Sequence, residues 1–209
     1  MRQFETYFFD FDGTLVDSYN SLVMVFEGAY SSVNTKVPEG YTLRLMRCPL
    51  FVGYEELNAP KDEESKQTFA NEIIRLLDDP EVLKATKPYE ETIKVLSTLK
   101  KQGKRLGIVT SNSQKHVKEV LHFLNIDENL FSIIVGNRET KKHKPNPDPI
   151  YKGMELLGLT DKSKICYVGD ALDDCLSAVN AGVTPVLIDR RHEYRDEYEI
   201  IIKDLNGLL

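Results

Sequence analysis

Short apolar runs alternate with longer amphipathic stretches along most of this chain of 209 residues. The apolar runs have the length of buried strands, and we expect strands at residues 5–10, 105–110, 131–135, 164–169 and 185–189. Apolar residues recur at helical spacing between them, which predicts helices at residues 89–102, 113–124, 147–157 and 172–181. This alternation is typical of βα units and predicts an α/β protein with a mainly parallel sheet.

Local signals at the ends of two of these stretches support the helix assignments. Gly103 follows the segment "LSTLKKQ", and glycine is common just beyond a helix C-terminus. Ser113 precedes "QKHVKEVLHFL", where its hydroxyl can accept a hydrogen bond from a backbone N–H of the first turn. We therefore expect one helix to end just before Gly103 and the next to begin just after Ser113.

The stretch from residue 16 to residue 87 departs from the alternation. It holds no convincing core strand, but residues 21–33 and 66–79 have amphipathic helical patterns. A connection of about seventy residues is much longer than an ordinary loop between a strand and a helix. We therefore predict an α/β core domain at residues 1–15 and 88–209, with an inserted helical domain at residues 16–87. The inserted domain would be able to close over the carboxyl ends of the strands.

The overall composition excludes some classes of function. Hydrophobic residues make up 41% of the chain and charged residues 29%, which is typical of a folded globular protein. The formal net charge is −6 at pH 7. Because a surface that binds nucleic acid must neutralise phosphates with basic side chains, we expect no nucleic-acid partner.

The cysteines and the apolar runs bear on the compartment. Cys48, Cys166 and Cys175 are odd in number and have no CxxC spacing, so neither a disulfide framework nor a zinc site is expected. The N-terminal segment lacks the apolar region of a signal peptide, and no run is as long as a membrane span. We predict a cytoplasmic protein without a membrane partner, and the sequence makes no prediction of its oligomeric state.

Polar residues gather at four places where the predicted strands end. Because the carboxyl ends of parallel strands meet at one edge of a sheet, side chains that follow different strands can meet there and form a ligand site. The four groups are Asp10, Asp12 and Thr14 in "FDFDGT"; Thr110, Ser111 and Asn112 in "GIVTSNS"; Lys144 in "KKHKPNPDP"; and Asp170, Asp173 and Asp174 in "YVGDALDD".

These residue types fit one kind of chemistry. Two carboxylates one residue apart, Asp10 and Asp12, are costly at a strand end unless a cation lies between them. Carboxylate ligands from two strands, without cysteine or histidine, suit a hard divalent cation such as Mg²⁺. A hydroxyl group, backbone N–H groups and a lysine suit the oxygens of a phosphoryl group. A metal ion and a phosphoryl group together would offset the repulsion between the paired acids.

With these motifs the chain resembles the haloacid dehalogenase-like superfamily of phosphohydrolases. "DFDGT" at residues 10–14 looks like its nucleophile motif, Thr110 like its hydroxyl motif, Lys144 like its lysine motif and "GDALDD" like its GDxxxD acidic motif. The resemblance spans most of the chain and points to the phosphoglycolate phosphatase-like and β-phosphoglucomutase-like group. It implies a doubly wound, mainly parallel, Rossmann-like sheet of five or more strands in the order 5-4-1-2-3. It also implies a helical cap inserted after the first motif.

The resemblance implies catalytic and substrate-binding roles for five of the matched residues. Asp10 would attack phosphorus and form an aspartyl-phosphate. Asp12 would protonate the leaving oxygen and then activate the water that hydrolyses the intermediate. The phosphoryl oxygens would be bound by the Thr110 hydroxyl, the Ser111 backbone N–H and the Lys144 ammonium group.

A metal site is implied in the same way. Mg²⁺ would be held by the carboxylates of Asp10 and Asp170 and by the backbone carbonyl of Asp12. Asp174 would lie in or just behind the metal shell, where it would orient the shell or hold Lys144. The implied cofactor is therefore Mg²⁺, and the implied partner is a small phosphorylated metabolite.

The leading functional hypothesis is a Mg²⁺-dependent phosphatase. Asp12 argues against a dehalogenase, because members of the superfamily that displace halide need no acid at that position. A sugar phosphomutase or a pyrophosphatase of the same superfamily is the alternative, whereas a phosphonate hydrolase would be expected to use a cap lysine that we cannot identify. A non-catalytic, receiver-like module is less favoured, because it would carry its phosphorylated aspartate on a later strand and need no insertion.

Several neighbouring residues have simpler interpretations. Lys141 and Lys142 belong to a charge run, so we expect them to be solvated, with His143 in the same loop. Asp173 can cap the helix that follows it.

In the inserted domain, Arg44 and Arg47 either reach a second anionic group of the substrate or are ordinary surface arginines. Phe26, Tyr30 and Phe51 are expected in the core of that domain rather than against a substrate.

Overall fold

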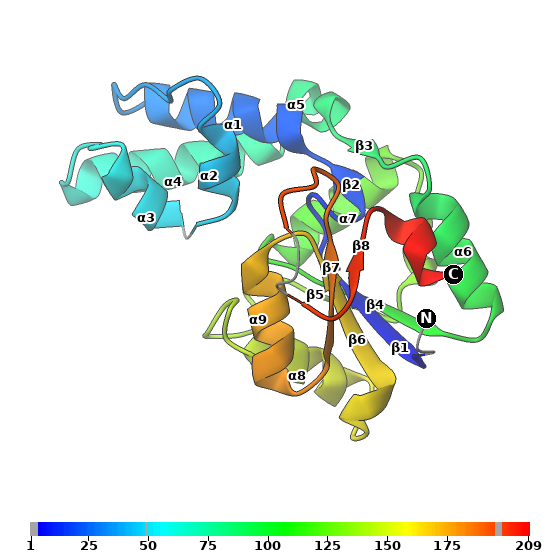
Figure 1. Cartoon of the computed structure of the whole chain (residues 1–209). Helices are drawn as coiled ribbons and strands as arrows, with labels where there is room; N and C mark the ends of the chain where they lie inside the picture. Colours follow the sequence, from blue (N-terminus) through cyan, green and yellow to red (C-terminus); the bar gives the residue numbers. More distant parts are fainter. Residues whose placement is uncertain (1–3, 49, 195–197) are drawn as a thin grey trace. The chain divides into compact units, whose positions relative to one another are not determined.

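A computed structural model describes residues 4–48, 50–194 and 198–209 of the chain (Figure 1). The chain forms two units. The core unit comprises the chain up to Asp17 together with Pro88–Leu209, and the inserted unit comprises Ser18–Lys87. The inserted unit therefore interrupts the core unit between its first strand and the rest of its sheet.

The core unit is built on a six-stranded sheet with the order β5-β4-β1-β6-β7-β8, and neighbouring strands pair in parallel. The predicted α/β class and the order of the five predicted strands are confirmed. β8 was not predicted, because a two-residue edge strand leaves no pattern in a sequence. The strands are β1 (Thr6–Phe9), β4 (Arg105–Val109), β5 (Ile133–Val135), β6 (Ile165–Gly169), β7 (Thr184–Ile188) and β8 (Ile201–Ile202).

Helices lie on both sides of this sheet (Figure 1). On one side α8 and α9 pack against each other, and on the other side α6 packs with the 3₁₀ helix η3. Phe8 of β1 and Tyr167 of β6 share one buried cluster with Ile150 of α8 and Ala178 of α9. The helices of this unit are α6 (Thr92–Lys101), α7 (Gln114–Phe123), η1 (Glu128–Leu130), α8 (Asp148–Leu156), η2 (Lys162–Lys164), α9 (Leu172–Ala181) and η3 (Leu205–Leu208).

The two predicted helix boundaries are confirmed. Ser113 precedes α7, and its side chain accepts a hydrogen bond of 3.1 Å from the His116 backbone N–H. Gly103 lies two residues beyond α6 with φ of 74°, a left-handed conformation that costs glycine little because it has no Cβ. Both signals acted through local backbone chemistry, so they could be interpreted without knowledge of the tertiary fold.

The two connections to the inserted unit pair with each other. β2 (Val16–Asp17) and β3 (Lys87–Pro88) form a short two-stranded sheet of their own. Beside it, the Tyr89 backbone N–H donates to the Leu15 carbonyl over 3.4 Å. The chain thus leaves the core unit and returns to it at neighbouring positions.

The inserted unit is helical and has its own core. Tyr30, Tyr54 and Phe69 are almost completely buried, and the Phe69 ring centroid lies 4.8 Å from that of Tyr30 and 4.7 Å from that of Tyr54. Such close aromatic packing stabilises a small helical unit. Its helices are α1 (Tyr19–Ser31), α2 (Thr42–Met46), α3 (Leu50–Glu56), α4 (Glu63–Leu77) and α5 (Pro80–Ala85).

One aromatic prediction for this unit is wrong. Phe26 and Tyr30 are buried as expected, but Phe51 is 44% exposed. Phe51 lies in the first turn of α3 and touches the edge of the Tyr54 ring, with centroids 6.1 Å apart.

Across the described parts of the chain, no helix combines the length and the apolar character needed to cross a membrane.

Candidate active site

The register of the parallel sheet brings three of the predicted polar groups to one edge. Phe9 of β1 is aligned with Ile108 of β4 on one side and with Val168 of β6 on the other. Asp10 therefore follows β1 at nearly the level where Thr110 follows β4 and Asp170 follows β6. In-register strands are enough to gather side chains that are far apart in the sequence.

Three carboxylates converge at this edge. One oxygen from each of Asp10, Asp170 and Asp174 can be chosen so that all three oxygens lie within 4.8 Å of one another. Asp10 and Asp174 are buried, and burial strengthens their mutual repulsion. A set of carboxylate oxygens that is crowded and partly shielded from water fits a hard divalent cation such as Mg²⁺.

Lys144 supplies a positive charge inside the same group. Its ammonium nitrogen lies 2.8 Å from Asp10 Oδ1 and 2.5 Å from Asp174 Oδ1, and only 9% of its side chain is exposed. Burial alone would lower the pKa of Lys144, but the two carboxylates raise it well above its ordinary value. Lys144 is therefore a fixed cation, whereas its neighbours Lys141 and Lys142 are exposed as expected.

The environment of Asp10 disfavours its charge. Burial raises the pKa of this carboxyl to about 8; Lys144 opposes the change, and the nearby charges of Asp174 and Asp170 add to it. A cation bound among these carboxylates would favour the ionised form, because it adds the attraction that Lys144 alone does not fully provide.

Asp12 is held by a residue from the neighbouring strand end. The side-chain N–H of Asn112 donates a hydrogen bond to Asp12 Oδ2. Asn112 is itself fixed at its backbone: its N–H donates to Thr110 Oγ1 over 3.2 Å, and its carbonyl accepts from the Asn137 N–H over 2.8 Å. Sequence reasoning placed Asn112 in the second polar group but gave it no role. The available signal was its position two residues after Thr110.

A tight turn joins Asp12 to the metal-capable group. Gly13 has φ of 74°, and a Cβ at this position would lie 2.5 Å from Asp170 Oδ2, so glycine is required here for both reasons. The Thr14 hydroxyl donates to Asp170 Oδ1 over 3.4 Å. Hydrogen bonds or ion pairs therefore connect all four predicted polar groups to one another.

Asp174 rather than Asp173 has the capping geometry at the start of α9. Its Oδ2 accepts a hydrogen bond of 3.1 Å from the Ala171 N–H, while its Oδ1 accepts from Lys144. Asp173 is half-buried and lies outside the group of three carboxylates. The suggestion that Asp173 caps this helix is thus replaced by a double role for Asp174.

Ser111 follows Thr110 and has an exposed side chain, which leaves its backbone N–H as the expected phosphate donor.

The arginines considered in the inserted unit have different surroundings. Arg44 forms a two-point ion pair with Glu56, which also accepts a hydrogen bond of 2.8 Å from the Tyr41 hydroxyl. This engagement matches the interpretation of Arg44 as a surface arginine better than a role in binding a substrate anion. Arg47 is half-buried at the end of α2.

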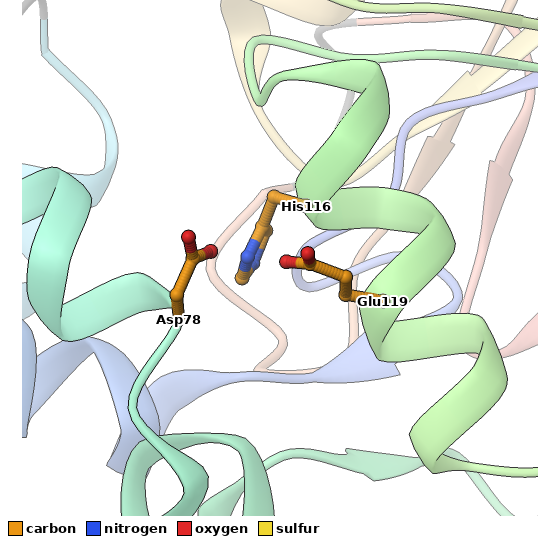
Figure 2. Close-up of side chains that lie close together, drawn as sticks. All are labelled: Asp78, His116 and Glu119. Atoms are coloured by element: carbon orange, nitrogen blue, oxygen red, sulfur yellow. The ribbon is translucent and has the colours of Figure 1, made fainter.

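Two other side chains that could bind a metal ion lie on α7. His116 and Glu119 project from the same side of this helix (Figure 2). Within the core unit this is a pair of ligands from a single helix, and Glu119 Oε1 is already 3.3 Å from the Lys115 ammonium nitrogen. We assign no metal site to this pair.

The comparisons with known proteins agree with the geometry. Residues 7–188 match the family profile described as haloacid dehalogenase-like hydrolase. The chain is 29% identical to pyrophosphatase PpaX of Halalkalibacterium halodurans, over 89% of this chain and 84% of that protein. It is also 29% identical to a phosphoglycolate phosphatase of Pasteurella multocida, over 93% of this chain and 89% of that protein. A solved structure described as a haloacid dehalogenase-like hydrolase from Bacteroides fragilis gives a TM-score of 0.89 at 25% identity, and covers 99% of this chain and 100% of that one.

Proposed function

Because the chain belongs to the haloacid dehalogenase-like hydrolases and is a phosphohydrolase, we propose that it is a Mg²⁺-dependent phosphatase of small phosphorylated metabolites. The proposed reaction proceeds through an aspartyl-phosphate on Asp10. One observation carries this proposal. A buried aspartate follows the central strand, contacts a buried lysine at 2.8 Å, and lies within 4.8 Å of two further carboxylates.

In the first half-reaction, an Asp10 oxygen attacks phosphorus and forms a new P–O bond as the bond to the leaving oxygen breaks. Lys144 is positioned to neutralise phosphoryl oxygens beside Asp10, and the Thr110 hydroxyl and the Ser111 N–H follow the neighbouring strand. These groups stabilise negative charge that accumulates on phosphorus-bound oxygens in the transition state. They are effective because they are already fixed in position before the substrate binds, so no free energy is spent on orienting them during the reaction.

Asp12 moves the proton in both half-reactions. It first gives a proton to the leaving oxygen, and it then takes a proton from the water that attacks the aspartyl-phosphate. Hydrolysis returns Asp10 to its free carboxylate and releases inorganic phosphate. The hydrogen bond from Asn112 holds the Asp12 side chain in one orientation.

Mg²⁺ would be held by the carboxylates of Asp10 and Asp170 and by the backbone carbonyl of Asp12, with Asp174 in or just behind its shell. When bound, such an ion neutralises charge on the phosphoryl group and on the carboxylates. Asp174 has a second task, because it connects Lys144 to the first turn of α9. The inserted unit is proposed to act as a cap over the reacting groups, and the protein is proposed to be cytoplasmic.

The substrate class is supported by the names of the relatives. One is called a pyrophosphatase and another a phosphoglycolate phosphatase. Both names describe small phosphorylated compounds, and we propose that this chain acts on a compound of that size. A pyrophosphatase is the favoured second candidate, and a sugar phosphomutase is the third.

Phosphate release tests the proposal directly. The purified protein should release p-nitrophenol and phosphate from p-nitrophenyl phosphate through many turnovers with Mg²⁺, and excess EDTA should stop the reaction. A receiver-like module would stop after one phosphoryl group per chain or would not react. Absence of turnover on this compound, on pyrophosphate and on a panel of phosphorylated metabolites would contradict the proposal.

The same panel separates the candidates. Ranking pyrophosphate, phosphoglycolate and sugar phosphates by kcat/KM identifies the preferred class. A phosphomutase would convert one sugar phosphate into an isomer without stoichiometric release of phosphate, which nuclear magnetic resonance of ³¹P distinguishes from hydrolysis.

A further inference from the structure

Arg190 follows β7 and reaches back to the turn that comes after Asp12. Its Nε donates to the Gly13 carbonyl over 3.3 Å, and its Nη2 donates to the Thr14 carbonyl over 3.0 Å. Two donors of one planar group thus bind two successive carbonyls. This geometry suits guanidinium, whose N–H groups point outward in fixed directions, and does not suit an ammonium group.

The rest of the guanidinium group is also occupied. Nη1 of Arg190 forms an ion pair of 2.8 Å with Glu91, and the guanidinium carbon lies 3.4 Å from the centroid of the Tyr89 ring. Only 17% of the Arg190 side chain and 12% of the Glu91 side chain are exposed. Glu91 Oε1 additionally accepts from the Leu205 backbone N–H over 3.3 Å. Such a satisfied and mostly buried ion pair is rigid, because each partner loses much if it moves away.

The loop that carries Arg190 is itself held in place. The Asp189 carboxylate accepts hydrogen bonds of 2.9 Å and 3.0 Å from the backbone N–H groups of Glu193 and Tyr194. The Asp189 N–H donates to the Ile202 carbonyl of β8 over 2.7 Å. Arg190 therefore projects from a fixed base rather than from a loose loop.

The turn held by Arg190 matters because of its neighbours on both sides. Asp12 directly precedes Gly13, and the Thr14 side chain donates to Asp170. Within the turn, the Gly13 N–H donates to the Val16 carbonyl over 2.8 Å. A shift of this turn would move the proton donor and disturb a metal-capable carboxylate together.

Arg190 also joins the two connections to the inserted unit. The turn at Gly13 leads into β2, and Tyr89 comes directly after β3. The Leu15 carbonyl between them accepts from the Thr92 hydroxyl over 2.8 Å. Arg190 thus lies where the outgoing and the returning segments are attached to the core unit.

We propose that Arg190 is a positioning residue for the phosphatase reaction: its guanidinium group holds the Gly13–Thr14 turn in the geometry that aims Asp12 at the substrate. The inference rests on the proposed function and goes beyond it, since Arg190 matches none of the four motifs. Its role is exerted through backbone carbonyls and is separate from substrate contact.

Chemical rescue tests this role. In R190A, kcat on p-nitrophenyl phosphate should fall by about 100-fold, because small misplacements of reacting groups cost about that much, while KM changes little. Millimolar guanidinium chloride should restore a measurable part of kcat in R190A, whereas equal sodium chloride should not. R190K keeps the charge but cannot bind both carbonyls and Glu91 in one plane, so guanidinium should not rescue it. The matched control is R191A, one residue along and exposed, which should keep wild-type kcat.

A second readout does not depend on turnover. Backbone amides of residues 13–16 should exchange with deuterium faster in R190A than in the wild type or R191A, since the clamp on their turn is gone. If R190A does not fold, R190K carries the same exchange measurement. An R190A enzyme with wild-type kcat, or with unchanged exchange in the turn, overturns the inference. A wild-type protein without turnover would sink the proposed function instead, and the exchange result would still decide whether Arg190 holds the turn.

Discussion

At the scale of single residues, the site depends on a balance of charges around Lys144. This lysine contacts Asp10 and Asp174, and Asp170 belongs to the same carboxylate group. A buried lysine shared by two carboxylates holds both in place, because leaving any of these charges unpaired costs several kcal/mol. The carboxylate of Asp10, the proposed nucleophile, is thereby fixed before a substrate binds.

The first prediction concerns the nucleophile. Asp10→Asn should abolish turnover, with a loss on the order of 10⁴-fold or more, because a neutral amide is a poor nucleophile. The fold should survive, since the amide oxygen can still accept the hydrogen bond from Lys144. Phosphate release and thermal unfolding measured on the same sample check both statements. Activity close to wild type would remove Asp10 from the mechanism.

The second prediction concerns Asn112. Asn112→Ala removes the hydrogen bond that orients Asp12. Because misplacing a reacting group can cost about 100-fold in rate, kcat should fall by at least about 10-fold. The control is Asn129→Ala: the Asn129 side chain donates a hydrogen bond to Asp127 on the exposed surface, and its loss should not affect kcat. Equal rates for the two variants would show that Asp12 needs no support from Asn112.

Residue types and their spacing pointed to some of these candidate residues but not to all of them. Asp10, Lys144 and Asp170 stand out in the sequence because each is a charged residue in a recognisable motif at a strand end. Arg190 does not, because the carbonyl of Gly13 that it binds lies 177 positions away and any loop arginine looks the same locally. Long-range contacts to backbone atoms leave no trace in residue identity.

At the scale of secondary structure, the parallel strands create the site. β1 pairs with β4 on one side and with β6 on the other, so residues that follow these three strands meet without any long loop. The strands and helices of the core unit could be predicted because their apolar periods are regular. β5 begins at Ile133 rather than at residue 131, because Phe131 is the C-cap residue of the 3₁₀ helix η1, whose N-cap is Asp127. The sequence pattern gives little indication of whether such residues join the turn or the strand.

The third prediction concerns the proposed metal site, whose carboxylates follow β1 and β6. Mg²⁺ should raise the melting temperature of the wild type, because it binds the carboxylates of the folded protein and not the unfolded chain. At a Mg²⁺ concentration of 100 times Kd, the free energy of unfolding should rise by about 2.7 kcal/mol. Asp170→Asn should remove most of this shift. Asp173→Asn is the matched control, since Asp173 lies in the first turn of α9 but outside the group of three carboxylates. This variant should show the same increase in melting temperature with Mg²⁺ as the wild type. A shift retained in Asp170→Asn would contradict the proposed ligand set.

At the scale of the whole molecule, the chain consists of two units with separate cores. Among the described residues, the aromatic cluster of the inserted unit shares no member with the cluster beneath the sheet. In the sequence, seventy-odd residues without a core strand are too many for an ordinary loop, which is why we predicted an inserted domain at residues 16–87. In the structure, Ser18–Lys87 forms a compact unit of helices. The sequence could not indicate which aromatic side chains stay on the surface, as the exposure of Phe51 demonstrates.

The fourth prediction follows from these separate cores. Phe69→Ala removes the ring that packs on both Tyr30 and Tyr54, and should destabilise the inserted unit by about 3–5 kcal/mol. Hydrogen exchange should accelerate across α1 and α4 but not in β1, β4 and β6. Phe8→Leu in the core unit is the converse control, with faster exchange expected in the sheet. Equal acceleration throughout the chain would mean that the two units unfold as one.

The pairing of β2 with β3 has an evolutionary consequence. The chain leaves the core unit and returns to it at adjacent positions. For the sheet, the insertion of about seventy residues is therefore equivalent to a short hairpin loop. Natural selection, or a protein engineer, can therefore exchange that module for one of different size without changing the register of any strand in the core sheet.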